Sequence, residues 1–300
     1  MNKIVVIGCG KVGMAYIFAL VNGKNSTEIV MIDKDTEKLD GEKMDLCHTL
    51  NYIPSNIKLK VGDYSDCDDA DIICITAGVS QSNIGSDRLN DLKKANVIYK
   101  DIFENINKTK FNGVLLIASN PLDVMSYLAY KYSNLPSSKV IGSGTSLDTS
   151  RLKYLISEKL DINPKSIHAY VIGEHGNSEF PCWSKANIAN QNINEFLSKE
   201  EMEELADKTK NAGYEIIKKK GATYYGIAMA LVRITTAILN DEDAIIPVSN
   251  YDKTNRVYIS TPCVIGKDGI KQRIFLELSK NEEKKLQKSI DIIKKAINSI

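Results

Sequence analysis

The chain has 300 residues, a length that allows one large domain or two of modest size. Hydrophobic residues make up 43% and charged residues 26%, as in ordinary globular proteins, which argues against disordered, fibrous and disulfide-dense small proteins. The 39 basic and 38 acidic side chains leave a formal net charge of +1, so the composition indicates neither a nucleic-acid nor a membrane partner.

Short apolar segments alternate with helical segments over the first half of the sequence. We expect strands at 3–7, 29–32, 57–61, 72–76, 114–118 and 139–141. Helices are expected between them at 12–21, 37–50, 88–107 and 121–132. Such alternation is typical of a parallel sheet covered on both faces. The sequence therefore predicts an α/β fold with a doubly wound, six-stranded parallel sheet of the Rossmann type.

The second half has a different pattern. We expect helices at 146–159, 199–219, 224–239 and 281–300, and strands at 167–172, 244–249, 256–262 and 272–275. This pattern indicates an α+β domain. We place the boundary after Gly142, which gives domains 1–142 and 143–300. Because no Pro- or Ser-rich linker separates the halves, we expect a broad interface between them, where ligand sites are common.

The six cysteines show no C-x-x-C spacing, so the sequence indicates neither a zinc site nor a redox motif. Scattered cysteines fit a reducing compartment. The apolar run at 4–7 is broken by Gly8 too early for a signal peptide, and no stretch approaches about 18 uninterrupted apolar residues. We therefore expect a cytoplasmic protein without a resident metal.

A glycine-rich run lies where the first strand meets the first helix. Gly8, Gly10 and Gly13 form a G-x-G-x-x-G pattern after the strand at 3–7, and Lys11 and Val12 open the helix. Glycines at these positions permit a tight turn and close approach of a pyrophosphate, which the free N–H groups of the helix can bind. An ordinary glycine-rich turn is the alternative.

Asp33 lies 20 residues beyond Gly13, at the end of the second strand. An acid there can accept hydrogen bonds from the adenosine ribose, and it repels a 2′-phosphate, so NAD is favoured over NADP. The next residues are Lys34 and Asp35, which leave room for an incomplete preference. We predict NAD as the cofactor.

His175 stands in the polar segment 173–178, just after an expected strand. Catalytic groups are common in such loops, and imidazole exchanges a proton near neutral pH. An alcohol oxidised by NAD must lose a proton from its hydroxyl as its carbon loses hydride, so a group of this kind is needed.

Asp148 and Arg151 lie three residues apart at the start of an expected helix, and so share roughly one face. An acid in the first turn interacts favourably with the helix dipole, and it can form a local ion pair with the arginine. The spacing alone favours this structural interpretation over a functional one.

Taken together, these segments resemble the L-2-hydroxyacid dehydrogenase family that contains lactate and malate dehydrogenases. The similarity spans essentially all 300 residues, and its motifs come in the family's order. They are 8–13, 76–78, 87–89, 119–121, 142–151, 173–178 and 221–226. The remaining histidines, His48 and His168, match no functional position, and we interpret them as structural.

The resemblance implies that the α+β domain, residues 143–300, binds the substrate and is the catalytic domain, and it implies a role for each of four residues. His175 would be the acid and base on the substrate oxygen, and Asp148 would orient its imidazole and stabilise the protonated form. Arg151 would bind the substrate carboxylate through two parallel hydrogen bonds. Arg88 would polarise the reacting carbonyl from a mobile loop.

The resemblance also implies further ligand contacts. Asn120 would hydrogen-bond near the substrate and the nicotinamide, and the peptide bond between Asn120 and Pro121 would be cis. Beyond the glycine run and Asp33, the residues that match cofactor contacts are Thr76, Ala77, Gly78, Asn120 and Ile227.

The segment 79–88 resembles the loop that closes over the substrate in this family. Malate enzymes place an arginine in it, but residues 79–87 contain neither Arg nor Lys. A second substrate carboxylate would be left unpaired, at a cost of several kcal/mol, so malate is disfavoured. Lactate enzymes carry glutamine there, and Gln81 is our candidate. Because the segment is slightly longer than usual, Ser82 is the alternative.

Thr223 matches a threonine that narrows the lactate pocket, which fits the methyl group of pyruvate. We therefore expect reversible hydride transfer between NADH and pyruvate, giving L-lactate. Asn177 and Asp87 also resemble hydroxyisocaproate dehydrogenases, so reduction of larger 2-oxoacids is the alternative, and a non-catalytic NAD-binding sensor is disfavoured. As the family assembles into oligomers, we expect a homotetramer, or failing that a dimer.

Overall fold

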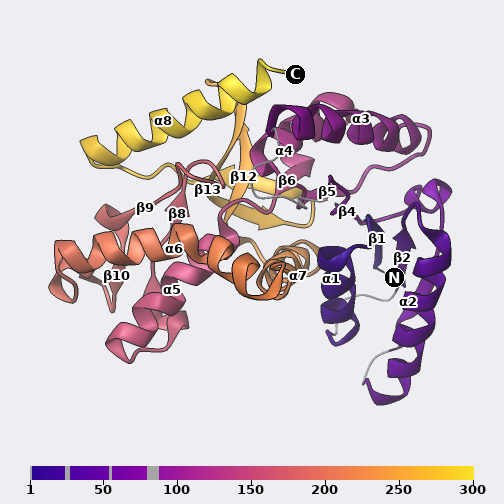
Figure 1. Cartoon of the computed structure of the whole chain (residues 1–300), viewed down its shortest axis with the longest axis horizontal. Helices are drawn as coiled ribbons and strands as arrows, with labels where there is room; N and C mark the ends of the chain where they lie inside the picture. Colours follow the sequence, from indigo (N-terminus) through magenta and orange to yellow (C-terminus); the bar gives the residue numbers. More distant parts are fainter. Residues whose placement is uncertain (1, 24–27, 54–55, 80–87) are drawn as a thin grey trace.

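A nine-stranded sheet runs through the protein (Figure 1). The computed structural model describes residues 2–23, 28–53, 56–79 and 88–300. Within them the strand order is β14-β13-β12-β6-β5-β4-β1-β2-β3. Six neighbouring strands are parallel: β1 (Lys3–Ile7), β2 (Glu28–Ile32), β3 (Lys58–Val61), β4 (Ile72–Ile75), β5 (Val114–Ile117) and β6 (Val140–Gly142). The predicted six-stranded parallel sheet is confirmed.

The strand order reverses at β1, which pairs with β2 on one side and β4 on the other. Successive residues of these buried strands pack against opposite layers, so Val5 and Val6 belong to different core clusters. One layer contains α1 (Lys11–Val21), α2 (Thr36–Thr49) and α7 (Tyr225–Leu239), and the other contains α3 (Arg88–Ile106) and α4 (Leu122–Tyr132). In a sheet wound in this way, ligands bind beyond the carboxyl ends of the strands at the reversal point.

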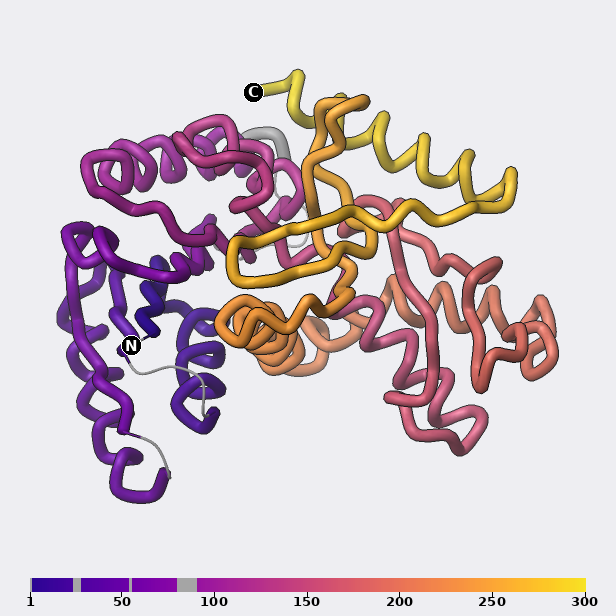
Figure 2. Tube along the Cα trace, turned by 180° about the vertical axis from the view of Figure 1, so that it is seen from behind, coloured from indigo at the N-terminus to yellow at the C-terminus, as the bar shows by residue number. Residues whose placement is uncertain are grey.

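Helix α7 comes from the second half of the chain but covers the sheet beside α1 (Figure 2). The buried Tyr16 hydroxyl of α1 lies 2.5 Å from the Thr235 Oγ1 of α7, so the two helices share a hydrogen bond as well as apolar contacts. The sequence predicts both helices but not this pairing, because their periodicity shows an apolar face without showing its partner.

Three antiparallel strands of the second half extend the sheet beyond β6. They are β12 (Ala244–Asp252), β13 (Val257–Gly266) and β14 (Gly269–Arg273). The junction is a single register pair between Ser249 and Gly142. A Cβ atom on Gly142 would lie 2.8 Å from the Cβ of Ser249, so a glycine is needed where the two halves meet.

Helices α5 (Ser146–Leu160) and α6 (Lys199–Lys220) pack against each other away from the parallel strands, whereas α8 (Lys280–Ile297) packs against β13 and α4 (Figure 1). The single strand expected at 167–172 is wrong, because it is divided into β7 (Ile167–His168) and β8 (Val171–Ile172), which pair in different sheets. The remaining strands are β9 (Phe180–Pro181), β10 (Asn187–Ile188) and β11 (Gln191–Asn192).

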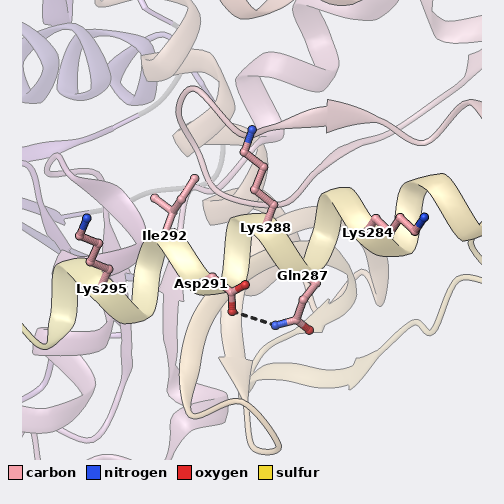
Figure 3. Close-up of a pocket in the computed structure, with 6 residues that line it drawn as sticks. All are labelled: Lys284, Gln287, Lys288, Asp291, Ile292 and Lys295. Carbon is pink, nitrogen blue, oxygen red and sulfur yellow. Dashed lines mark hydrogen bonds between the residues drawn. The ribbon is translucent and has the colours of Figure 1, made fainter.

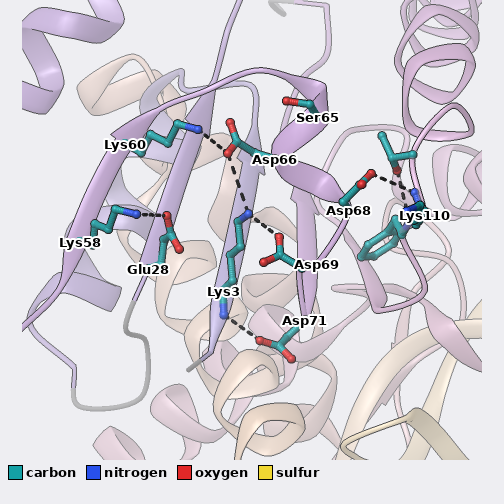
Figure 4. Close-up of polar contacts among 12 residues, drawn as sticks. Lys3, Glu28, Lys58, Lys60, Ser65, Asp66, Asp68, Asp69, Asp71 and Lys110 are labelled. Carbon is teal, nitrogen blue, oxygen red and sulfur yellow. Dashed lines mark hydrogen bonds and ion pairs between the residues drawn. The ribbon is translucent and has the colours of Figure 1, made fainter.

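Charged side chains gather at the amino ends of the parallel strands (Figure 4). Lys3 forms an ion pair of 2.5 Å with Asp69, and its backbone N–H donates to Asp71 at 2.7 Å. Lys60 pairs with Asp66 at 2.5 Å. These charges therefore satisfy one another at the edge of the sheet opposite Gly8.

Among the described residues, no helix is both long enough and apolar enough to cross a membrane.

Candidate active site

The three glycines after β1 have different surroundings. Gly8 has a φ of 95°, and a Cβ atom there would lie 2.4 Å from the nitrogen of Ala77. On Gly13 it would lie 2.3 Å from the carbonyl oxygen of Gly8. On Gly10 it would meet no atom of the described residues within 4 Å. Packing therefore requires Gly8 and Gly13, whereas Gly10 leaves open space in front of the turn.

Helix α1 presents a free amino end at this turn. It begins at Lys11 after Gly10, with no capping side chain among the described residues and no acid in its first turn. The backbone N–H of Cys9 donates to the carboxylate of Asp33 at 2.6 Å, so Asp33 lies next to the turn. Free N–H groups beside open space suit a pyrophosphate, and a neighbouring carboxylate suits ribose hydroxyls. These features fit a dinucleotide.

The loops after β4 and β5 continue the same edge. The Thr76 hydroxyl donates to the carbonyl of Gly8, and the Ser119 hydroxyl donates to the carbonyl of Ala77. Gly78 lies against Ser119, since a Cβ atom on it would be 3.7 Å from the Cβ of that serine. Hydrogen bonds therefore join the turn at Gly8, the loop 76–78 and the loop at Ser119 into one surface.

Asn120 is exposed at the end of this surface, and its peptide bond with Pro121 is cis, as expected. Helix α4 begins directly afterwards. The amide of Asn120 is therefore open to a ligand, although its predicted role stays a prediction.

One carboxylate joins the two other candidate catalytic groups. Asp148, in the first turn of α5, has a side chain only 2% exposed. Its Oδ1 accepts from Arg151 Nη1 at 2.8 Å, and its Oδ2 lies 2.7 Å from His175 Nδ1. The ion pair expected from the spacing is confirmed. Because an ionised carboxylate only accepts hydrogen bonds, the proton lies on Nδ1 and leaves Nε2 for another partner.

The His175 loop is held by backbone and side chains from distant segments. Gly173, with a φ of 101°, exchanges two 3.0 Å backbone hydrogen bonds with Ser260 of β13. Ser289 of α8 donates to the carbonyl of Ser178 at 2.9 Å, and a Cβ atom on Gly173 would crowd this serine. The imidazole therefore projects from a fixed loop.

Asp123 is a buried acid that the sequence analysis did not single out. It lies in the first turn of α4, is 2% exposed, and accepts from the backbone N–H of His175 at 2.8 Å. Its other oxygen accepts from the Ser249 hydroxyl at 2.6 Å. The spacing Ser119-Asn120-Pro121-Leu122-Asp123 shows only an acid near a helix start, so nothing in the sequence separates it from an ordinary first-turn residue.

Glu179 is a second acid that the sequence analysis missed. Its side chain is 5% exposed, and its Oε2 lies 3.9 Å from His175 Nδ1. The available signal was its place four residues after His175 and directly before the apolar Phe180. Burial of this acid depends on tertiary packing, which spacing does not show.

The environment shifts the pKa of each group in this cluster. Burial would lower the pKa of His175, but attraction and hydrogen bonding to Asp148 prevail and raise it to about 9. Burial would raise the pKa of Asp148, but the neighbouring His175 and Arg151 hold it below its ordinary value. Burial raises the pKa of Asp123 to about 6, and burial together with Asp148 raises that of Glu179 to about 9.

The segment with Thr223 and Ile227 joins α6 to α7. Helix α6 ends at Gly221 in the left-handed conformation, and the half-buried Thr223 follows. A Cβ atom on Gly226 would lie 2.7 Å from Leu147, so the start of α7 packs beside the residue that precedes Asp148. Ile227 packs against the core around α1.

Two predicted substrate residues cannot be placed. Gln81 lies outside the described residues. Arg88 begins α3, but its side chain also lies outside the described part of the chain. Their proposed contacts stay predictions.

Two sequence profiles match nearly the whole chain. The lactate/malate dehydrogenase NAD-binding domain matches residues 2–142, and the α/β C-terminal domain of the same family matches residues 145–300. The chain belongs to the lactate/malate dehydrogenase family. NAD, the predicted cofactor, is thereby confirmed, as are the predicted enzyme class and fold class.

Two relatives of this chain are named L-lactate dehydrogenases. An L-lactate dehydrogenase of Halalkalibacterium halodurans is 43% identical over 98% of this chain and 96% of its own. L-lactate dehydrogenase 1 of Staphylococcus aureus is 44% identical over 98% and 95%.

Solved structures agree with these relatives. A lactate dehydrogenase from a deep-sea metagenome library superimposes with a TM-score of 0.96, at 46% identity over 99% of this chain and 98% of that one. The minor L-lactate dehydrogenase of Enterococcus mundtii gives 0.97, at 36% identity over 100% and 98%.

Asp148, His175 and Glu179 could also be considered as metal ligands, because their ligand atoms lie within 4.8 Å of one another. However, His175 Nδ1 already faces Asp148 at 2.7 Å, and the other oxygen of this carboxylate binds Arg151. Both oxygens are occupied by donors, so we interpret the cluster in this dehydrogenase-family chain as one that holds protons.

A hollow on the outer face of α8 is separate from this cluster (Figure 3). Its floor is one exposed helix face, and one hydrogen bond of 2.9 Å joins Gln287 to Asp291 across it. None of the predicted site residues lines it. Its lining residues are Lys284, Gln287, Lys288, Asp291, Ile292 and Lys295.

Proposed function

We propose that this chain is an L-lactate dehydrogenase that transfers hydride reversibly between NADH and pyruvate. The observation that carries the proposal is the Asp148 carboxylate, which holds Arg151 on one oxygen and His175 on the other. In this proposal a cation that binds a carboxylate and a group that donates a proton lie side by side, as a 2-oxoacid requires. The names of the curated relatives support the choice of pyruvate.

Bound NADH would supply the hydride. His175, protonated on Nε2, gives its proton to the 2-oxo oxygen as the hydroxyl forms, and takes it back in the reverse direction. Asp148 accepts from Nδ1–H throughout and stabilises the imidazolium. Arg151 has further N–H groups besides the one used by Asp148, and these bind the substrate carboxylate.

The remaining roles concern orientation and substrate size. Asn120 would hold the substrate near the nicotinamide, and Arg88 would polarise the carbonyl. Thr223 would narrow the pocket around the methyl group. Gln81 would face that group in place of a cation, so oxaloacetate would keep an unpaired carboxylate.

The proposal is tested by NADH oxidation with pyruvate, 2-oxoisocaproate, phenylpyruvate and oxaloacetate. We expect the highest kcat/KM for pyruvate, by roughly tenfold or more, because each additional methylene group must fit a narrow pocket. A preference for 2-oxoisocaproate or phenylpyruvate would replace lactate with a larger 2-hydroxyacid. A preference for oxaloacetate would contradict the assignment of residues 79–87.

We further propose that the enzyme works in the cytoplasm, in fermentation of pyruvate from glycolysis, as a homotetramer or dimer. All six cysteines are free, which supports a reducing compartment. Size-exclusion chromatography with light scattering at micromolar concentration would measure the assembly, and a monomer would contradict the proposed tetramer or dimer.

We also propose that the chain divides into two domains, residues 1–142 and 143–300.

A further inference from the structure

Glu179 places a second buried carboxyl group against the catalytic imidazole. Its Oε2 is 3.9 Å from His175 Nδ1, beyond hydrogen-bond distance, whereas Asp148 is at 2.7 Å. The side chains of Glu179 and Asp148 are 5% and 2% exposed, so water screens neither from the other. Their carboxylate oxygens lie within 4.8 Å of each other, and two negative charges at that distance in a buried site disfavour each other strongly.

The described cations nearby are already taken. Arg151 and the imidazole both bind Asp148, and none of the described residues brings another cation within hydrogen-bond distance of Glu179. A substrate carboxylate on Arg151 would add a further negative charge. Burial and Asp148 both raise the pKa of Glu179, to about 9, in agreement with this excess of negative over positive charge around its carboxyl group.

We propose that Glu179 is a positioning residue whose carboxyl group carries a proton in the form of the enzyme that binds the 2-oxoacid, and that its ionisation weakens this binding. The inference rests on the proposed function, because it concerns the site that would bind pyruvate. The neutral acid keeps the pocket from becoming too negative, and it fills the space beside the imidazole.

The titrating and charged groups around Glu179 come from several elements. Asp148 and Arg151 face it from α5, and His175 faces it from its own loop. Asp123 of α4 also acts on His175, more weakly than Asp148 and Glu179, and Glu174 acts on Asp123. His175 and Glu179 each favour the charged form of the other, so they titrate as a coupled pair.

The inference predicts how many protons accompany ligand binding. The proposed reaction needs His175 protonated, and the inference needs Glu179 protonated as well. As pH rises, both protons are lost from the free enzyme. The slope of log Kd against pH for an anionic pyruvate analogue therefore counts them.

The experiment measures the Kd of oxamate, an unreactive isostere of pyruvate, for the enzyme with bound NADH between about pH 7 and pH 10. We expect the slope to approach about 2 near pH 10 in the wild type and about 1 in Glu179→Gln, because both groups have pKa values near this range. Glu174→Gln removes an acid from the same loop and should keep the slope of about 2.

Two results would overturn the inference. One is a slope of about 1 in both proteins. The other is a fall of about one pH unit or more in the His175 titration of Glu179→Gln, which would show that wild-type Glu179 is ionised and supports the imidazolium.

Infrared spectroscopy gives a readout that needs neither substrate nor a stable variant. A protonated carboxylic acid has a C=O stretch that disappears on ionisation. We expect such a band in the wild type at pH 7 and its loss toward pH 10. Its absence at pH 7 would refute the inference about Glu179 even if pyruvate is reduced. Failure to reduce pyruvate with the band present would instead refute the proposed function.

Discussion

The turn after β1 and the loop after β8 both follow a buried strand, yet they are built differently. The first is shaped by its own glycines: Gly13 packs on the carbonyl of Gly8, and Gly8 packs on Ala77. The second is held by side chains from elsewhere, with Asp123 lying 52 residues away from His175 and Ser289 lying 111 residues away from Ser178. The comparison teaches that the glycines of a tight turn can be recognised from a local motif, even where they pack on a distant residue such as Ala77, whereas the partners of a charged side chain are brought together only by the fold.

The largest effect should come from removing the group that the second loop presents. His175→Ala should lower pyruvate turnover by roughly 10²–10⁴, because the 2-oxo oxygen loses its proton donor. Binding of NADH, measured by fluorescence titration, should be retained, since the cofactor contacts belong to the other region.

His168→Ala is the matched control for this variant, because His168 is exposed on β7 and has no place in the proposed chemistry. It should keep turnover within about twofold, as expected of a surface substitution. Comparable losses in the two variants would remove His175 from the mechanism.

Substitutions in the glycine turn should change the stability of the fold by different amounts, depending on the backbone conformation and the space at each glycine. Gly8→Ala places a side chain at a φ of 95° and against Ala77, so it should lower the free energy of unfolding by roughly 2–4 kcal/mol. Gly10→Ala meets open space in the protein, so its unfolding free energy should change by at most about 0.5 kcal/mol.

The same pair of variants separates packing from cofactor binding. Gly10→Ala should weaken NADH binding by about tenfold or more, because the new methyl group stands where the pyrophosphate approaches. Urea denaturation and NADH titration measure the two effects. If Gly10→Ala destabilised the fold and left the NADH affinity intact, our separation of the glycines would be wrong.

Asp123 should make stability depend on pH. Burial raises its pKa from 3.8 to about 6, so between these values the folded state binds the proton more readily than the unfolded state. Stability from this group is therefore present at low pH and is lost as pH rises through about 6. Relative to Asp123→Asn, the wild type should lose about 2 kcal/mol between about pH 4 and pH 7.

Urea denaturation at both pH values measures this difference, and the exposed Asp291 of α8 gives a control. Asp291→Asn makes the same change of charge at an exposed position. Parallel pH dependence in the wild type and Asp123→Asn would show that the folded state does not retain the proton on Asp123.

The smallest effect should come from the contact between α1, which follows the glycine turn, and α7, which belongs to the second half of the chain. Tyr16→Phe removes the buried hydrogen bond to Thr235 and should cost about 1–2 kcal/mol of unfolding free energy. A double-mutant cycle with Thr235→Val isolates the pair, and a coupling energy near zero would show that the helices are held by apolar contacts alone.

Much of the fold could be predicted because its strands are apolar and regularly spaced. The strand Lys3–Ile7 and the start of α5 at Ser146 agree with the expected bounds. The extension of the sheet through Ser249 and Gly142 could not be predicted, since one register pair between distant residues leaves no periodic signal.

Local spacing and motifs predicted part of the candidate site, as they did for the fold. The pairing of Asp148 with Arg151 follows from their spacing on one helix, and the choice of His175 came from the motif around it. Asp123 and Glu179 were missed because only tertiary burial distinguishes them from ordinary acids. The placements of Gln81 and of the Arg88 side chain remain predictions.

The single junction between β6 and β12 has a consequence for the order in which a ribosome makes the chain. All six parallel strands and the glycine turn are synthesised before Ser249, whose hydroxyl binds the Asp123 that holds the backbone of His175. A nascent chain that ends before β12 can therefore form the turn for the nucleotide, but it lacks the anchor for the histidine. Acquisition of catalytic competence is accordingly a late event in the synthesis of this protein, after its nucleotide-binding edge is complete.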